Sequence, residues 1–445
     1  MLIKVVDSML YQAPRGTTDI LPQEQEYWRF VAEKARALCE LYGYQRIDTP
    51  VFEQTGLFYH SVGEGTDIVE KEMYTFEDRS GEKMTLRPEG TAPVCRAYIE
   101  HGMHQLPQPV KLYYFCSIFR YERPQAGRYR QHQQFGFEAL GEADAALDAE
   151  VIDIAWQLYT SAGLRRLTLQ LNSLGCSFCR PGYLQRLEQY YSSYSQTLCR
   201  DCKTRLARNP LRLLDCKKPS CQEVIQGAPK ILEHLCLECN NHLRALREYL
   251  GDLQIPYEVN PYLVRGLDYY TRTVFEIQPE GGGAQSTLGG GGRYDNLIEQ
   301  LGGRPTPAVG FATGIERIIL NMRKQGIVLS PTSGLKVYVA YLGEVAGREA
   351  IKLVARLRQV GIGTTMALGS KSLKAQLKQA DALGVAQTII IGEEELKRGR
   401  VVLRDMLKGE QEEIPMDKVV NFIGGFMNSL DKDLLDTGAN LKYIK

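Results

Sequence analysis

Four arginines lie close together in the segment 119–131, which reads FRYERPQAGRYRQ. They are Arg120, Arg123, Arg128 and Arg130, with Glu122 as the single acid among them. Strand-forming residues flank the Arg/Gly/Pro loop, so the segment is predicted to be a β-hairpin. Each guanidinium group offers a planar fork of donors, which suits a phosphate ligand. Taken alone, however, the pattern is more typical of a solvent-exposed basic hairpin.

The glycine-based phosphate signatures do not accompany these arginines. The sequence contains no G-x-x-x-x-G-K-[ST] motif, and its glycine-rich stretch, Gly281–Gly292, lacks the context of a dinucleotide-binding turn. A nucleotide would therefore have to be bound by side chains. Because Gly281–Gly292 stands between a predicted strand and a GRYD motif, we expect it to form a close backbone wall beside a pocket.

Eight of the eleven cysteines fall in the 64 residues from Cys176 to Cys239. They form three C-x-x-C pairs and one wider pair, which are Cys176/Cys179, Cys199/Cys202, Cys236/Cys239 and Cys216/Cys221. The length of the chain and its N-terminal sequence argue against a secreted disulfide scaffold. Four thiolates bind one zinc ion, so two structural Zn²⁺ sites are predicted, with the pairing left open. The alternative is a set of free thiols without function.

The overall composition is that of an ordinary core-forming protein. Of 445 residues, 44% are hydrophobic and 24% charged, and the length suggests two to four domains. The 54 basic residues nearly balance the 53 acidic ones, which argues against coating nucleic acid by bulk charge while permitting local basic patches. No run of 18 apolar residues is present, so we expect no membrane span.

The elements that would position these residues are mixed in type. Apolar spacing predicts helices over 24–42 and 145–161, and Tyr- and Phe-rich segments predict strands over 44–51, 111–120 and 133–140. Strands without regular βαβ alternation indicate an α+β, largely antiparallel core.

Three further regions follow along the chain. The polar, mostly helical region 176–250 reads as an insertion, because strand signals resume at 262–277. The segment 325–334 resembles a linker. Regular alternation over 335–392 then predicts a small α/β domain with a mixed or parallel sheet.

Several motifs occur in a fixed order. They are PRGTTDILP (14–22), GYQRIDTP (43–50), TLRPEGTA (85–92), FRYERP (119–124), LVRGLDYYTRTVFE (263–276), GGRYDNL (291–297) and GFATGIERI (310–318). This set resembles the bacterial histidyl-tRNA synthetases, which are class II aminoacyl-tRNA synthetases. GYQRIDTP, the arginine hairpin and GFATGIERI are similar to class II motifs 1, 2 and 3, and the resemblance covers about 13–423.

The resemblance implies a fold and a division into domains. A class II antiparallel-sheet catalytic core would occupy 10–172 and 259–329, interrupted by a helical insertion at 173–258. An α/β anticodon-binding domain would occupy 334–425, followed by a tail at 426–445. The family further implies a cytoplasmic homodimer joined through the motif 1 region.

The implied reaction joins L-histidine to ATP as histidyl-adenylate and then transfers histidine to the 3′ end of tRNA(His). Arg120, Arg265 and Arg317 would be the catalytic residues, on the α-phosphate, on the α-phosphate and carboxylate, and on the γ-phosphate, respectively. Glu122, Arg128 and His132 would also contact ATP, and Mg²⁺ would neutralise the pyrophosphate. His132 stands where the family usually has an aromatic residue, so the adenine contact departs from the usual pattern.

The histidine pocket follows from the same resemblance. Glu138 would accept from one imidazole nitrogen, and Tyr270, with Tyr269 beside it, would meet the other. The residues implied to hold the α-ammonium group or to close the pocket are Glu89, Thr91 and Gln134, then Gly90 as a close backbone approach, and Tyr294. Without the order of the motifs, each residue alone would be better explained by an ordinary core or surface role.

The insertion is locally basic. Between Cys199 and Cys221 two acids, Asp201 and Asp215, accompany seven basic residues, which are Arg200, Lys203, Arg205, Arg208, Arg212, Lys217 and Lys218. This is a candidate patch for the tRNA backbone, with a solvated helical face as the equal alternative. We expect chelation of zinc to weaken acceptor-stem binding and to leave adenylate formation largely intact, since the motifs lie outside the insertion.

Two other functions compete with the ligase. A synthetase-like regulatory subunit of histidine biosynthesis would bind histidine without aminoacylating tRNA, but such paralogues usually lack the C-terminal domain and lose the arginine motifs. A zinc-knuckle nucleic-acid-binding protein would leave about four-fifths of the chain unexplained.

Overall fold

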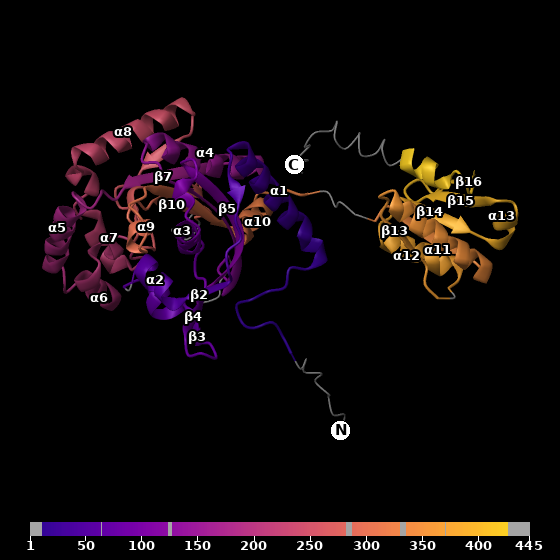
Figure 1. Ribbon diagram of the computed structural model, residues 1–445, viewed down its shortest axis with the longest axis horizontal. Coiled ribbons are helices and arrows are strands. Elements are labelled where there is room, and N and C mark those ends of the chain that lie inside the picture. The colour runs from indigo at the N-terminus through magenta and orange to yellow at the C-terminus, as the bar shows by residue number, and fades with distance from the viewer. Residues whose placement is uncertain are drawn as a thin grey trace, which may run out of the picture. The chain divides into compact units, whose positions relative to one another are not determined.

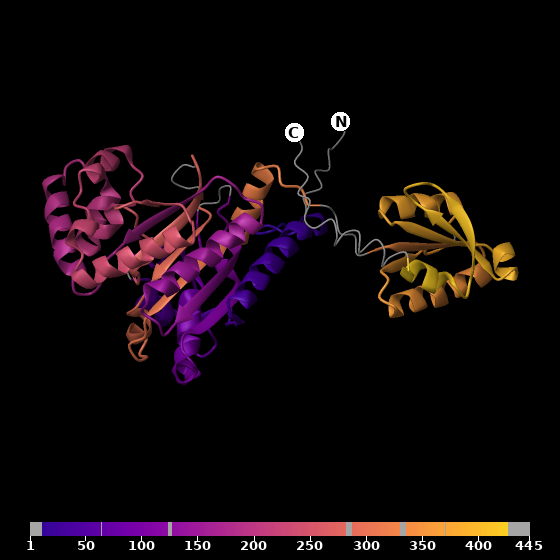
Figure 2. The same ribbon diagram turned by 90° about the horizontal axis from the view of Figure 1, so that it is seen from above.

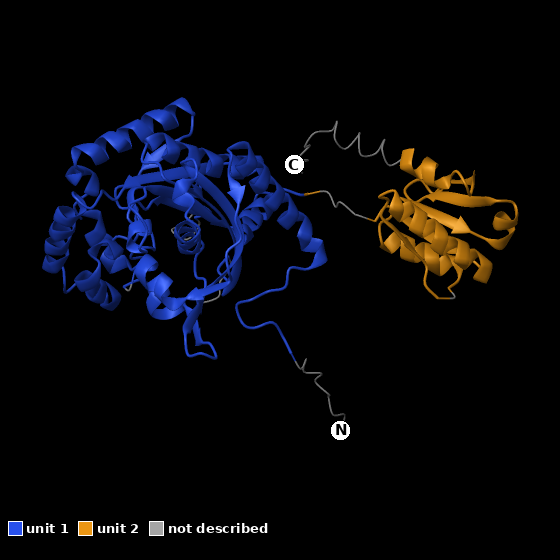
Figure 3. Ribbon diagram, in the orientation of Figure 1, with its two compact units in different colours: residues 1–328, 443–445 blue, residues 329–442 orange. Residues whose placement is uncertain are grey.

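The computed structural model describes residues 11–63, 65–122, 127–281, 287–329, 335–369 and 371–425. The chain divides into two compact units, residues 1–328 with 443–445 and residues 329–442 (Figure 3). Among the described residues, no helix is both long and apolar enough to cross a bilayer. The predicted tail at 426–445 lies outside the described residues.

An eight-stranded sheet forms the centre of the first unit (Figure 1). Its strands, in spatial order, are β1 (Gln45–Arg46), β5 (Val110–Phe119), β6 (Gln131–Leu140), β11 (Ala308–Gly314), β10 (Gly289–Arg293), β9 (Thr271–Pro279), β7 (Leu167–Ser173) and β8 (Tyr257–Val259). The six central strands pair antiparallel, and only the edge strands β1 and β8 pair parallel. The expected α+β, largely antiparallel core is confirmed.

Helices cover this sheet on both faces. On one face α4 (Ala145–Ser161) contacts β11, α10 (Ile315–Lys324) contacts β6, and α1 (Gln25–Leu41) and α8 (Leu237–Asp252) pack against α4. On the other face α3 (Thr91–Glu100) contacts β6 and packs against α2 (Thr55–Val62) and α9 (Leu297–Gln300). A small antiparallel sheet beside α2 consists of β2 (Phe52–Gln54), β4 (Lys83–Leu86) and β3 (Tyr74–Glu77).

The insertion is helical, as predicted, and gathers at one end of the large sheet (Figure 2). Before α8 it contains α5 (Arg180–Ser193), α6 (Arg200–Arg208), the short 3₁₀ helix η4 (Pro210–Leu213) and α7 (Pro219–Gln226). Its buried residues, such as Tyr183 and Leu187, belong to one continuous core with Tyr114 and Tyr270 of the sheet region. The insertion is therefore packed into the catalytic unit through a shared core.

Several predicted elements differ from the observed ones. The expected strand at 44–51 is only the two-residue β1, and in the expected strand 262–277 the pairing begins at Thr271. The glycine run was expected to form a wall beside a pocket, and Gly289 and Gly290 do line the cavity described below; that the second half of the run is the paired strand β10 was not predicted. A Cβ on Gly291 would come within 2.0 Å of the Gly310 carbonyl oxygen, so only glycines allow these strands to approach so closely.

The second unit contains a mixed five-stranded sheet, as the alternation predicts. Its order is β13 (Thr364–Met366), β12 (Val337–Tyr341), β14 (Gln387–Ile391), β15 (Arg400–Asp405) and β16 (Gln411–Pro415). Its helices include α11 (Glu344–Gln359), α12 (Leu373–Ala382) and the short α13 (Glu393–Lys397), and residues 419–425 are also helical. The sequence pattern did not reveal β15 and β16, which pair antiparallel at one edge.

Candidate active site

One cavity of about 810 Å³ opens on the α3 side of the large sheet. All but one of the side chains expected to bind histidine or ATP line it, which are Glu89, Thr91, Arg120, Glu122, Arg128, His132, Gln134, Glu138, Arg265, Tyr269, Tyr270, Tyr294 and Arg317. Gly90 is the exception among them. Arg123 falls in the undescribed segment 123–126. Residues from distant parts of the sequence thus share one chamber.

Strand β6 supplies three residues of this lining through its two-residue period. His132, Gln134 and Glu138 project to the same face, because alternate side chains of a strand point the same way. Gly136 stands between them, opposite Tyr114 of β5. A Cβ at Gly136 would lie 2.4 Å from the Tyr114 ring, so the glycine makes room for that tyrosine.

Glu138 is buried and surrounded by hydroxyl donors. Its Oε1 accepts from Thr91 Oγ1 at 2.8 Å and from Tyr114 Oη at 3.0 Å, and its Oε2 accepts from Tyr294 Oη. Burial raises the pKa of Glu138 to about 8. The three hydroxyl donors act in the opposite direction, because their hydrogen bonds stabilise the ionised carboxylate. Tyr114 is a hydrogen-bond partner of Glu138 that the sequence analysis missed, since only the strand register reveals it.

Glu89 and Gly90 stand at the start of α3, where each also has a structural role. The Glu89 carboxylate accepts from the backbone N–H groups of Thr91 and Ala92, both at 2.7 Å, and so completes the start of α3. A Cβ on Gly90 would lie 2.4 Å from the ring of Tyr114. The glycine is therefore needed for the packing of Tyr114, which itself donates to Glu138, and the expected approach of the Gly90 backbone to a ligand stays a prediction.

Gln134 has an acceptor that is free to bind a ligand. Its Oε1 is buried and has no hydrogen-bond partner among the described residues. An orphaned buried acceptor costs about 1–3 kcal/mol, so a donor brought by a ligand would be strongly favoured there. The tyrosines Tyr269, Tyr270 and Tyr294 stand near it, with ring centroids 4.7 Å apart for the first two and 5.6 Å for Tyr269 and Tyr294.

The arginines form the basic end of the cavity. Arg120 Nε donates to the Pro88 carbonyl at 2.7 Å, and Arg317 Nε donates to the Gly127 carbonyl at 3.3 Å, so backbone oxygens orient both. Arg128 pairs with Glu122 at 3.3 Å. Burial, and then the positive charge of Arg128, lower the pKa of Arg317. An anion bound among these groups would relieve their repulsion.

Arg265 also lines the cavity and is held by an ion pair with Glu276 of β9. Burial alone would lower the pKa of Arg265, but the adjacent Glu276 carboxylate raises it above its ordinary value. Glu276 also accepts from Thr287 Oγ1 at 2.7 Å, which fixes its position. Glu276 is a second residue that the sequence analysis missed.

Two further groups complete the basic end. Burial, together with the charges of Arg120 and Arg317, lowers the pKa of His132 to about 3, so its imidazole is neutral and able to stack against an aromatic base. Glu316 accepts from the Gln133 N–H at 2.8 Å, and burial raises its pKa to about 7. Its Oε2 has no hydrogen-bond partner among the described residues.

The basic residues of the insertion contact acids of the catalytic core. Arg205 and Arg208 pair with Asp67 and Glu70 of the segment that flanks α2, and Lys217 pairs with Asp215 at 2.8 Å. Arg212 is buried and donates to the Arg265 carbonyl at 3.1 Å. Three of the seven members of the candidate tRNA patch, Arg205, Arg208 and Arg212, thus contact residues outside the insertion, which neither alternative anticipated.

An antiparallel sheet whose cavity is lined by arginines from the β5–β6 hairpin and from α10, the helix after β11, defines a class II aminoacyl-tRNA synthetase catalytic domain. The family model described as "Histidyl-tRNA synthetase" matches residues 16–177 and 196–318, and the model "Anticodon binding domain" matches 336–425. The chain belongs to the histidyl-tRNA synthetase family.

Individual relatives agree with this assignment. The chain is 60% identical over 411 residues to the histidine–tRNA ligase of Dehalococcoides mccartyi, covering 92% of this chain and 98% of the relative. It is 52% identical to that of Desulforamulus reducens, covering 93% and 99%. The crystal structure of apo Staphylococcus aureus histidyl-tRNA synthetase matches with a TM-score of 0.80 and 40% identity, covering 93% and 99%.

Proposed function

We propose that this protein is a histidine–tRNA ligase, which activates L-histidine with ATP and transfers it to tRNA(His). The observation that carries the proposal is the single cavity that joins Glu138, Gln134 and the tyrosines to four arginines. One end suits a small amine with a hydrogen-bonding ring, and the other suits polyphosphate. The regulatory alternative receives no support, because the arginine motifs and the C-terminal domain are both present.

Histidine is bound at the Glu138 end. A neutral imidazole carries one donor and one acceptor, and we propose that Glu138 accepts from the donor while Tyr270, beside Tyr269, meets the acceptor. The unpartnered Gln134 Oε1 then receives the α-ammonium group, with Glu89 and Thr91 adding negative and polar character nearby. Tyr294 closes the pocket through its bond to Glu138.

Activation requires control of charge and no general base. The attacking carboxylate of histidine is already ionised at neutral pH. We propose that Arg120 and Arg265 hold the α-phosphate from two sides, and that Arg317 holds the γ-phosphate with Arg128 assisting. The neutral His132 stacks on the adenine, and Glu122 orients Arg128 through their ion pair.

Two carboxylates at this end fit Mg²⁺. Glu122 and Glu316 both line the cavity, and Glu316 has a buried oxygen that lacks a partner among the described residues. Mg²⁺ prefers oxygen ligands and is usually bound by one or two carboxylates together with substrate phosphates. Glu122 and Glu316 would hold the ion, which when bound neutralises the charge of the departing pyrophosphate.

The proposed roles predict a pH dependence for histidine binding. The pKa of Glu138 is raised to about 8 in the free cavity, and an imidazole N–H donor stabilises the ionised form, so the bound pKa must be lower. Binding then releases a proton below pH 8 and strengthens as the pH rises toward 8. The KM for histidine should fall by about eightfold between pH 7 and pH 8.5.

Pyrophosphate exchange at several pH values measures this dependence. The Glu138→Gln variant, which cannot ionise, should show a flat profile over the same range. A wild-type KM that rises with pH would contradict the assignment of Glu138 as the acceptor.

The C-terminal unit is proposed to read the anticodon. A chain ending at Leu329 retains the whole cavity, and the two units are separately compact, so this chain should still form adenylate. Its kcat/KM for tRNA should fall by about tenfold or more, because the contacts to the anticodon are absent. Comparison of tRNA charging with ATP–pyrophosphate exchange separates the effect on tRNA recognition from the effect on adenylate formation. Unchanged tRNA kinetics would assign anticodon recognition elsewhere.

Other properties are proposed on the family resemblance. The catalytic core would span 10–172 and 259–329 with the insertion at 173–258, and the protein would work in the cytoplasm as a homodimer through the motif 1 region. Exposed apolar side chains beside that motif, Val51, Phe52 and Phe76, support such an interface. The test of the main proposal is charging of tRNA(His) with histidine, and absence of charging alongside intact histidine binding would favour the regulatory alternative.

A further inference from the structure

Each C-x-x-C pair of α6 and α8 spans the start of its helix. Cys199 and Cys236 are the N-cap residues, and Cys202 and Cys239 are the third residues of the first turn. One helical turn therefore presents both sulfurs of a pair to the same side. The positive end of the helix dipole also favours thiolates at these positions.

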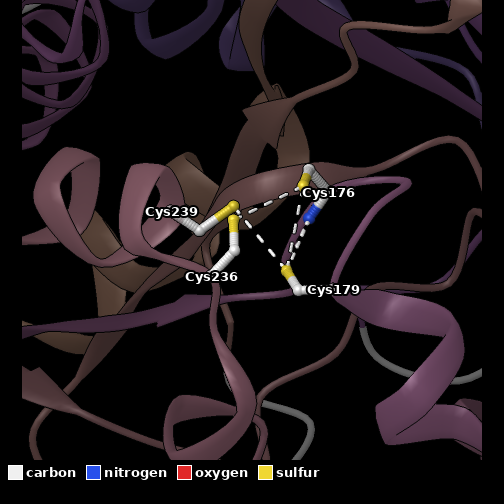
Figure 4. A group of neighbouring side chains, drawn as sticks. All are labelled: Cys176, Cys179, Cys236 and Cys239. Carbon is white, nitrogen blue, oxygen red and sulfur yellow. Dashed lines mark hydrogen bonds between the residues drawn. The ribbon is translucent and has the colours of Figure 1, made fainter.

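The first cysteine cluster consists of Cys176, Cys179, Cys236 and Cys239 (Figure 4). The sulfur of Cys176 is 3.8 Å from those of Cys179 and Cys236, and the sulfur of Cys179 is 3.8 Å from that of Cys239. A tetrahedral zinc ion with Zn–S bonds of about 2.3 Å sets its sulfurs about 3.8 Å apart. The observed spacing is the spacing that zinc requires, and it is far longer than a disulfide bond of about 2.05 Å.

The second cysteine cluster consists of Cys199, Cys202, Cys216 and Cys221. The sulfurs of Cys199 and Cys216 are 3.9 Å apart, and all four lie within 4.8 Å of one another. In each cluster a backbone N–H also points at a sulfur at 3.3 Å, from Cys176 to Cys179 and from Cys199 to Cys221. Such donors stabilise thiolates bound to a metal.

We propose that each cluster binds one structural Zn²⁺ ion, and that the first ion holds the segment carrying Tyr270 in place. Four protein thiolates leave no open coordination position, so both sites are closed and carry no reacting water. The spacing alone left open which cysteine pairs share an ion; in the structure, two pairs share a site where the starts of their helices lie next to each other. Cysteines 60 residues apart in the sequence share the first site.

The link from the first cluster to the histidine pocket is short. Arg180, which follows Cys179, donates to the Leu174 carbonyl at 3.0 Å and to the Tyr270 carbonyl. Leu174 and Gly175 are hydrogen-bonded to Arg272, with distances of 2.6 and 2.8 Å. Tyr270 is thus fixed by the turn that contains Cys176 and Cys179.

Gly175 shows how tightly this turn is closed. Its φ is +68°, in the left-handed region, and a Cβ there would lie 2.8 Å from the Cys179 sulfur. The turn at Gly175 therefore packs directly against the first cysteine cluster. Loss of the ion would free this turn, and with it the backbone on which Tyr270 and Arg272 depend.

The second cluster faces a different contact region. It anchors α6 and η4, where Asn209 donates to Asp268 at 2.9 Å and Arg212 donates to the Arg265 carbonyl. These contacts change the expectation that chelation would spare adenylate formation. Both clusters connect to the loop 260–270, so loss of zinc should weaken the histidine site as well as tRNA binding.

The first experiment measures metal content by elemental analysis of full-length protein purified under reducing conditions without chelator. The wild-type protein should carry about two zinc ions, one for each cluster of four cysteines. Cys236→Ser/Cys239→Ser and Cys216→Ser/Cys221→Ser should each carry one, and Cys39→Ser, a buried cysteine of α1 outside both clusters, should carry two. Zinc near zero even after addition of Zn²⁺, or iron in its place, would overturn the proposal.

The second experiment tests the link to Tyr270 by hydrogen exchange before and after removal of zinc from the wild-type protein. The amides of Leu174 and Arg272 should exchange about tenfold faster, while β12 and β14 of the second unit stay unchanged. Unaltered exchange at Leu174 and Arg272 in protein shown to be metal-free would overturn the link.

A third experiment measures kinetics and therefore depends on the proposed function. The measurements of metal content and of hydrogen exchange do not depend on it. The Cys236→Ser/Cys239→Ser variant should raise the KM for histidine by about tenfold, because small displacements of a positioning segment are costly. The KM for ATP should change less. If exchange at Leu174 accelerates while no histidine activity exists in any form of the protein, the proposed function fails and the zinc sites stand.

Discussion

Replacing Arg265 by alanine is expected to slow adenylate formation by about 10²–10³-fold, the scale for losing one preorganised donor to a developing negative charge. The loss has two parts. The guanidinium that would face the α-phosphate disappears, and the partner carboxylate of Glu276 remains in the cavity without its cation. An unpaired negative charge beside the phosphates adds to the barrier. Histidine binding should weaken less, because Glu138 and Gln134 are untouched.

Single-turnover formation of adenylate measures this effect separately from substrate binding. Arg304→Ala removes an exposed arginine of the same unit and serves as the matched control, with no expected change. A variant lacking Arg265 that exchanges pyrophosphate at nearly the wild-type rate would defeat the role assigned to this residue. The double variant Arg265→Ala/Glu276→Gln should recover part of the loss if the uncompensated carboxylate contributes.

Replacing Glu138 by glutamine is expected to lower kcat/KM for histidine by about 10²-fold. A hydrogen bond to a charged group contributes about 1.5–3 kcal/mol. In addition, the glutamine amide has one acceptor oxygen where the carboxylate has two, so it cannot keep all three hydrogen bonds from Thr91, Tyr114 and Tyr294. The KM for ATP should change less, because the hydrogen bonds of Glu138 are to Thr91, Tyr114 and Tyr294 and not to the arginines.

The matched control is Glu299→Gln, an exposed glutamate of α9. Titration of histidine and of ATP in the exchange assay separates the two ends of the cavity. Equal losses for both substrates would indicate a general disruption of the sheet, and an unaltered KM for histidine would remove Glu138 from the recognition site.

The fold could be predicted where a segment shows its own period. The helix predicted over 145–161 is α4 with the same bounds, and the strand predicted over 133–140 is β6 with two more residues. The prediction was incomplete where neighbouring strands decide the structure, because no strand was recognised in the glycine-rich stretch. β10 is composed almost entirely of glycine, which has no strand preference, and it forms because β9 and β11 approach on both sides.

The candidate site was accessible mainly through its motifs. Residue types and order indicated which side chains would gather, and these side chains line one cavity. Tyr114 and Glu276 were not accessible, because their roles come from the strand register and from a contact with Arg265. A tyrosine in a buried strand gives no local signal that distinguishes a hydrogen-bond donor from ordinary core packing.

The cysteine pairing and the arginines of the insertion illustrate the same limit. Spacing indicated four-cysteine sites and left their pairing open, since the pairing depends on which helix starts meet. Charge counting found a basic segment, but Arg205 and Arg208 form ion pairs with acids more than a hundred residues away in the sequence. Sequence separation of this size hides a partner that only the tertiary structure reveals.

The central claim is that one cavity selects histidine and activates it with ATP. The most direct test is ATP–pyrophosphate exchange with the purified full-length protein, with each of the other amino acids in parallel. The account predicts exchange with histidine and exchange lower by about 10⁴-fold or more with amino acids that leave Glu138 and the tyrosines unpaired. Exchange independent of histidine, or equal exchange with another amino acid, would contradict it.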